Sequence, residues 1–328
     1  MSLRSLFQES SVPPVAVEIT AARVSAAAID WRGGQPVVST HASELLPPGA
    51  LVPALASVNT RDRAALSTAV SRVLERMGRP RRVGLIVPDM VAKVSLVRFE
   101  QVPARAQDFE QLVRWQASKA APFPIEDAQL SYVPGVRVPA IPDGAPAGQE
   151  VIVTLAKRDV VREYEGLCDE AGAHAGLVDL STFNVVNAVL ASSTTTGGDW
   201  LLVNVAPDSA SVAIVRGSAL VFFRNRSAEA DGTLADLVHQ TAMYYEDRLS
   251  GGGFSRVVLA GAASAVLDQT GEIDDLRQRL QDRLATSVER FDPRHAVGLS
   301  DRIAAAPQFL DTLTPLLGLL LRGRKVPA

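Results

Sequence analysis

The chain has 328 residues, of which 47% are hydrophobic and 21% charged, and its formal net charge is −3. This length allows a large core and favours two or more domains, and the weak acidic balance excludes a strongly basic nucleic-acid-binding surface. The single cysteine, Cys168, excludes a disulfide framework, and the absence of a signal-peptide pattern or a run of ~20 apolar residues predicts a cytoplasmic protein.

The first predicted element is a strand–turn–strand segment at Val15–Ile29. A similar segment, Leu201–Val215, follows about 186 positions later. Both place β-forming residues on each side of a short polar turn. The repeat predicts two related α/β halves that face each other across a cleft.

The remaining elements of the first half follow in chain order. They are a Gly33–Gly34 turn, a strand at 36–41, a helix at 61–77 with Thr60 as N-cap, and a strand at 83–87. A block with a different order of strands and helices then interrupts this half. Its predicted elements are a strand at 91–99, a helix at 107–119, a strand at 129–136, a Pro- and Gly-rich hairpin tip at 134–149, a strand at 150–156 and a helix capped by Asp159.

A helix at 181–190 is expected to return to the first domain, and the polar segment 192–199 marks the main boundary. The second half repeats the order of the first, with strands at 200–206, 210–216 and 219–224, a helix at 231–249 and a strand at 256–260. We therefore expect a first domain of residues 1–90 plus 178–195, an inserted α+β module at 91–177 and a second domain at 196–328.

The repeat resembles the actin-like (ribonuclease-H-like) ATPase fold, in which two such halves hold a nucleotide. Gln101–Tyr132, with its Pro-Phe-Pro turn, resembles the type IV pilus assembly protein PilM family. Residues 150–190 and the final TPLLGLLLR at 314–322 are similar to later segments of that family. The resemblance extends from about Val15 to Arg322. It implies duplicated actin-like α/β domains, an inserted module in the first half and a reduced or missing subdomain in the second.

The two phosphate hairpins of that family carry Asp-x-Gly. An aspartate there orients Mg²⁺, and a glycine lets backbone N–H groups approach the phosphate. In this chain the hairpins read Glu18-Ile19-Thr20 and Asn204-Val205-Ala206, and Pro207 removes a further N–H. Glu18 has a longer side chain than aspartate, and Asn204 lacks the charge. Thr20 and Ala206 each add a Cβ where the family has glycine. These differences predict loss of ATP hydrolysis.

The part of the cleft that holds adenosine in the family also differs. Leu259–Ala263 stands where the family has a Gly-Gly loop, and only residues 225–233 stand where the family has a subdomain. No cofactor or metal is firmly expected. Weak binding of ATP and Mg²⁺ stays open through hydroxyl and hairpin N–H groups. Asp208 is interpreted as a turn residue in preference to a displaced Mg²⁺ ligand. The degenerate cleft is expected to contain Glu18, Thr20, Ala21, Asn204, Ala206, Ser209, Ser211 and Gly261.

The resemblance also implies a partner, because in that family the N-terminal tail of the membrane protein PilN lies in a groove between the first domain and the insert. The candidate contacts are Val83, Leu85, Val87, Val91, Val94 and Phe123. Two prolines restrain Phe123 on either side. It is either a partner contact or, as we favour, part of the core of the insert.

Three functions remain open. The leading hypothesis is a non-catalytic scaffold, held at the inner membrane through PilN-like and other platform proteins of a type IV pilus or related secretion system. The alternatives are an ATP-binding conformational switch and a filament-forming actin-like protein of the cell-division type. We expect the apolar run at 313–321 to form a final helix on the second domain, with a membrane contact as the alternative.

Overall fold

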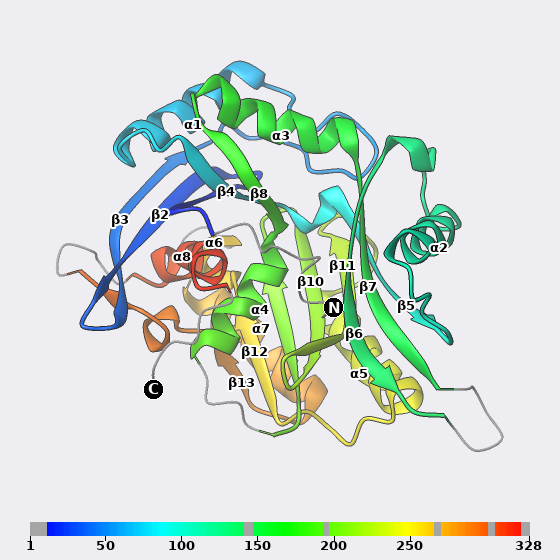
Figure 1. Ribbon diagram of the computed structural model, residues 1–328. Coiled ribbons are helices and arrows are strands. Elements are labelled where there is room, and N and C mark those ends of the chain that lie inside the picture. Colours follow the sequence, from blue (N-terminus) through cyan, green and yellow to red (C-terminus); the bar gives the residue numbers. More distant parts are fainter. Residues whose placement is uncertain (1–11, 141–146, 193–196, 266–269, 301–305, 323–328) are drawn as a thin grey trace.

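Three β-sheets organise the chain, for which the computed structural model describes residues 12–140, 147–192, 197–265, 270–300 and 306–322 (Figure 1). The first sheet has six strands in the order β14-β3-β2-β1-β4-β8. The second has five, in the order β11-β10-β9-β12-β13, and the third has three, in the order β5-β7-β6.

The strands of the first sheet are β1 (Val15–Ile19), β2 (Arg23–Arg32), β3 (Gln35–Leu45), β4 (Arg82–Val87), β8 (His174–Leu180) and β14 (Gly298–Leu299). Those of the second are β9 (Asp199–Val205), β10 (Ser209–Arg216), β11 (Ala219–Ser227), β12 (Arg256–Ala260) and β13 (Val288–Arg290). The third sheet contains β5 (Ala92–Phe99), β6 (Ala128–Val138) and β7 (Gly148–Lys157). The helices are α1 (Arg63–Arg76), α2 (Ala106–Ser118), α3 (Arg158–Glu170), α4 (Ser181–Ser192), α5 (Leu234–Leu249), α6 (Ala262–Ala265), α7 (Thr270–Leu284) and α8 (Pro307–Leu320).

The two large sheets repeat one topology. In the first, β3-β2-β1 pair antiparallel and β1-β4-β8 pair parallel, and the second does the same with β11-β10-β9 and β9-β12-β13. Even an irregularity recurs: the register shifts after Ala28 in β2 and after Ile214 in β10, 186 positions later. The predicted duplication and actin-like α/β fold class are confirmed.

The insert is smaller than the predicted 91–177. Strand β8 pairs with β4 in the first sheet, and α3 shares a core cluster with α1. Residues 158–180 therefore lie with the first sheet, because the strand at 174–180 is parallel to β4 and needs a crossover helix to reach it. The three-stranded sheet keeps β5, β6 and β7, with α2 on one face.

Three predicted helix starts are wrong. Asp62, and not Thr60, caps α1 by accepting from the N–H of Ala65, because the amide and hydroxyl of Thr60 both donate to Glu163. Helix α3 begins at Arg158, so Asp159 lies in its first turn, and α5 begins at Leu234 behind a capping box formed by Thr233 and Asp236. The strands of the insert hairpin extend into the predicted tip at 134–149, of which residues 141–146 lie outside the described chain.

The C-terminal helix packs on the first half rather than on the second, contrary to prediction. Its leucines, among them Leu313, Leu316 and Leu319, are buried in one cluster with Ala16 and Ile86 of the first sheet. Gly318 lies against the backbone of Asn184 in α4, where a Cβ would clash. The apolar run at 313–321 is therefore core, which excludes the proposed membrane contact for those residues; residues 323–328 lie outside the described chain.

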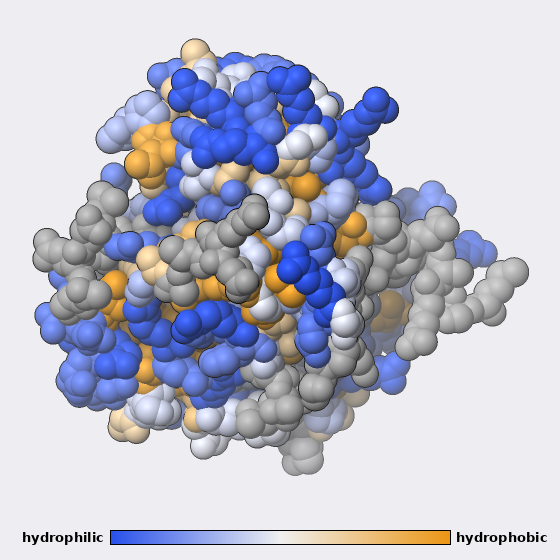
Figure 2. Space-filling view, turned by 90° about the vertical axis from the view of Figure 1, so that its left-hand side faces the viewer, coloured by the Kyte–Doolittle hydropathy of each residue, from blue (hydrophilic) through white to orange (hydrophobic). Residues whose placement is uncertain are grey.

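The face on the side of β3 carries mainly hydrophilic residues, with hydrophobic ones in small, separate patches (Figure 2). In the described part of the chain, no helix has the length and apolar character that crossing a membrane requires.

Candidate functional site

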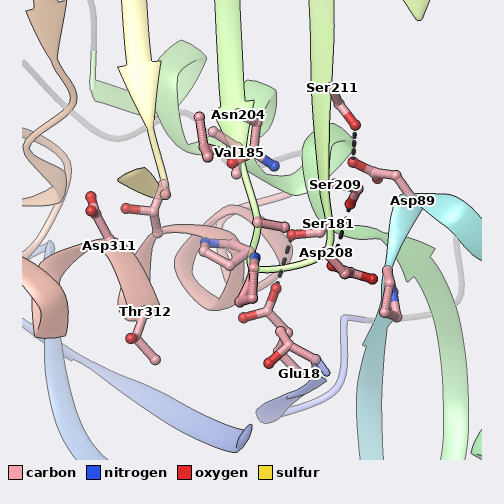
Figure 3. A pocket seen from close by; sticks show the side chains of 18 of the residues that line it. Glu18, Asp89, Ser181, Val185, Asn204, Asp208, Ser209, Ser211, Asp311 and Thr312 are labelled. Carbon is pink, nitrogen blue, oxygen red and sulfur yellow. Dashed lines mark hydrogen bonds between the residues drawn. The ribbon is translucent and has the colours of Figure 1, made fainter. Parts of the chain in front are cut away.

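The two hairpins meet at a cleft between the large sheets (Figure 3). Glu18 reaches it from the first sheet, Asn204 and Ser211 from the second, and α8 borders it through Asp311 and Thr312. The lining includes every predicted cleft residue except Ala21. The cavity is only about 50 Å³, whereas ligand pockets usually enclose roughly 300–1,000 Å³.

One N–H at the start of each turn is already bonded within that turn. The N–H of Thr20 donates to the carbonyl of Arg23 at 2.9 Å, and that of Ala206 donates to the carbonyl of Ser209 at 2.8 Å. The hydroxyl of Thr20 also accepts from the N–H of Arg23 at 3.1 Å. A phosphate that used these particular N–H groups would have to replace these bonds.

Asp89, which the sequence did not single out, connects the two halves directly. It lies in a 3-10 turn after β4 and is 5% exposed. Its carboxylate accepts from the N–H of Thr182 at 3.1 Å, from the Thr182 hydroxyl, and from the Ser211 hydroxyl of the second sheet at 2.6 Å. The side chain of Asn225 donates to the Asp89 carbonyl at 3.0 Å. We call these four residues the Asp89 network.

The network also explains Asn204 in place of the family aspartate. Its side-chain amide donates to the hydroxyl oxygen of Thr182 at 2.9 Å, and that hydroxyl in turn donates to Asp89. An ionised aspartate can only accept, so at position 204 it would face an oxygen whose proton is already used.

Burial raises the pKa of three carboxyl groups in the cleft. For Glu18 it raises the pKa from 4.5 to about 7, against the lowering effects of the Ser181 hydroxyl, 2.9 Å away, and of Arg23. Burial likewise raises the pKa of Asp89 and of Asp208. A triphosphate would add negative charge among groups that already resist ionisation. Within the described ranges, no three His, Cys, Asp or Glu side chains cluster closely enough to hold a metal ion.

Helix α8 forms a second bridge across the cleft. Asp311 accepts from the N–H of Ala263 in the second half at 2.8 Å and pairs with Arg290 at 3.5 Å. The next residue, Thr312, accepts from the guanidinium of Arg23 in the first sheet at 3.0 Å. The cleft is too small for a nucleotide as it stands, and one N–H in each turn is already bonded. The two halves are also joined across the cleft by Asp89 and by α8. The cleft residues therefore do not fit a bound nucleotide.

A second hollow, of about 740 Å³, lies between the first sheet, the insert and the second sheet. We call it the groove. The edge strand β8 lines it with residues 175–180. Helix α3 borders it through Val161 and Glu165, and α4 through Phe183, Val186 and Leu190. The insert contributes one face of its sheet, formed by Gln129, Ser131, Val133, Ile152, Thr154 and Ala156.

The groove has a mixed lining, in which apolar side chains predominate over polar ones and a few are charged. Val133 is 45% exposed within it, and Arg322 pairs with Asp179 at 2.9 Å near its wall. Burial also raises the pKa of Glu165. Such a lining suits a peptide with apolar side chains and a few polar ones.

The predicted partner residues divide into two groups. Val87 and Val91 line the groove, whereas Val83 and Leu85 are fully buried in the core of the first sheet. Strand β8 lies outside β4 in the sheet, and the side chains of Val83 and Leu85 pack with α1 and α3 in one core cluster. Val94 packs between two core clusters, and Phe123 is half-buried and outside the groove lining.

Two facing halves of one topology, with an insert in the first, define an actin-like α/β protein. Residues 16–248 match the family model described as type IV pilus assembly protein PilM. The chain belongs to this family. No curated protein matches it.

Two solved structures agree with the fold. One, titled "PilM-PilN type IV pilus biogenesis complex", superposes with a TM-score of 0.76 at 20% identity, covering 96% of this chain and 99% of that one. The other, a Bacteroides thetaiotaomicron protein with an actin-like ATPase fold and unknown function, has a TM-score of 0.50 at 9% identity and covers 87% and 93%.

Proposed function

We propose that this protein is a non-catalytic scaffold of type IV pilus assembly that holds the N-terminal tail of a PilN-like membrane protein in the groove. The observation that carries the proposal is the contrast between a groove of about 740 Å³ and a cleft of about 50 Å³. The first can hold several residues of a peptide, whereas the second cannot hold a nucleotide without rearrangement.

Family membership supports the pilus role, and the shared fold with a PilM–PilN complex makes a PilN-like tail the natural occupant. The protein would then reach the inner membrane through its partner, as a peripheral component. The proposed loss of hydrolysis is supported by the closed cleft, because the N–H groups of Thr20 and Ala206 and the hydroxyl of Ser211 are engaged within the protein.

A matched pair of variants in the insert tests the groove. Val133 lies in the groove and is 45% exposed, and Val102 lies outside its lining and is 46% exposed. Val133→Asp would place a charge where an apolar peptide side chain must pack, whereas Val102→Asp would leave it in water.

Binding is measured by fluorescence anisotropy, with a labelled synthetic peptide of the PilN-like protein's N-terminal tail from the same organism. We expect Val133→Asp to weaken binding at least tenfold and Val102→Asp to change it less than twofold. No binding of the wild-type protein at high micromolar concentration would refute the proposal.

A further inference from the structure

We propose that the partner's tail binds as an added β-strand on the open edge of β8, which extends the six-stranded sheet into the groove. This inference rests on the proposed function and specifies how the tail is recognised. Strand β8 ends the sheet order and, among the described residues, forms a ladder with β4 alone. Its other edge therefore faces the groove.

Exposure along the strands supports an open edge. All of β1 is buried, and five of the six residues of β4 are buried, as expected for strands with neighbours on both sides. Four consecutive residues of β8, 176–179, keep intermediate exposure. An edge strand presents unpaired N–H and C=O groups, and peptides use such edges in β-strand addition.

The length of the open edge fits a short peptide. Residues 175–180 of β8 all line the groove. At ~3.3 Å per residue, they can oppose an extended segment of similar length, roughly 20 Å. The groove therefore accommodates a strand of about six residues alongside β8.

The two helices beside β8 predict the chemistry of that segment. Helix α3 lies above β8 in Figure 1 and α4 below it. Alternate side chains of an added strand would therefore face opposite walls. One set would meet Phe183, Val186 and Leu190 of α4, and the other would meet Val161 and Glu165 of α3. We infer a tail that alternates between apolar residues and residues that include a basic or hydrogen-bond-donating side chain.

The second strand at the groove, β6, is the poorer template. It contains Pro134, which has no N–H, and its register with β7 shifts between Pro134 and Arg137. Proline and bulges are devices that protect an edge from further pairing. Strand β8 contains no proline.

The test replaces backbone N–H by N-methyl at each position of the tail peptide in turn, with the full chain as receptor. In an added strand only every second N–H faces the neighbouring strand, so the effects should alternate. We expect more than tenfold weaker binding at alternate positions and less than twofold change between them, which serve as internal controls. Equal effects along the whole peptide would overturn strand addition.

Hydrogen exchange of the protein locates the added strand. We expect the unmodified peptide to slow amide exchange within residues 174–180. Protection confined to 128–138 would overturn the assignment to β8. Binding of the unmodified peptide with a flat N-methyl profile would remove strand addition and leave the proposed function intact, whereas no binding at all would remove both.

Discussion

The cleft and the groove share two structural elements but differ in what fills them. The first turn of α4 supplies Thr182 to the Asp89 network, and its later turns supply Val186 and Leu190 to the groove. The 3-10 turn after β4 places Asp89 in the cleft and Val91 in the groove. One hollow is closed by bonds of the protein itself, whereas the described residues leave its neighbour open.

The difference indicates where the fold has kept a binding capacity. In an actin-like protein that binds nucleotide, the ligand connects the two halves. Here Asp89 joins Thr182 to Ser211, and α8 joins Arg23 to Ala263. An intramolecular hydrogen bond contributes on the order of 1 kcal/mol to stability, so these bonds together can help hold the halves together without a ligand. The helix and turn that wall the groove are fixed at the same time.

The largest loss of stability is expected for a substitution of Gly261, which lies against the backbone at the end of β9. Gly261 has φ +73°, and a Cβ there would clash with the carbonyl oxygen of Val205 and lie 2.9 Å from the Asn204 amide oxygen. Gly217 has φ +61°, and an added Cβ there would meet no other heavy atom of the described residues within 4 Å. Gly217→Ala should cost about 1 kcal/mol from backbone strain alone. Gly261→Ala should cost about 3 kcal/mol or more, because the β9 turn must also move.

Denaturant unfolding of the two alanine variants measures both costs. The difference between them isolates the contact at the cleft from the left-handed backbone that both glycines share. Equal losses of stability would mean that the cleft wall can relax, and that its closure is not enforced by packing.

A pH-dependent effect should follow from Glu18. Its pKa in the folded protein is about 7, above the ordinary 4.5. Between these values the folded state binds more protons than the unfolded state, so stability falls as the pH rises through this window. With ~1.36 kcal/mol per pH unit, ionising Glu18 in the fold costs on the order of 3 kcal/mol.

Glu18→Gln keeps an oxygen to accept from Ser181 but cannot ionise. Relative to the wild type, it should gain about 2–3 kcal/mol of stability between pH 4.5 and pH 8. Urea unfolding at a series of pH values gives the difference, with Glu229→Gln at an exposed site as control. A difference that does not change with pH would contradict the burial of this carboxyl group.

The hairpins were predictable because their signals are local. Alternating apolar residues and a polar turn define β1–β2 and β9–β10, and the repeat needs no knowledge of packing to be recognised. Helix starts depend also on contacts that are distant in sequence. Thr60 has the right residue type for an N-cap, yet Glu163, more than 100 positions away, takes both of its donors.

The site itself depended on contacts that are distant in sequence. Ser211 is 122 positions from Asp89, and the only local sign for Asp89 was a carboxylate directly after a buried strand. The sequence predicts Val83 and Leu85 as groove residues because nothing in it places β8 beside β4. An apolar helix such as α8 likewise shows that it is buried, but not against which sheet.

The smallest expected effect is that of Mg-ATP, which should leave the thermal midpoint unchanged within about 1 °C at millimolar concentration. A ligand at a hundredfold excess over its Kd stabilises by ~2.7 kcal/mol, which would raise the midpoint of a chain of this size by several degrees. The PilN-like tail peptide is the positive control, because it should give such a rise. A concentration-dependent shift with Mg-ATP would show that the Asp89 network and the α8 bridge open for a nucleotide. In that case the protein would be a nucleotide-dependent switch, and the closed cleft would be one of its two states.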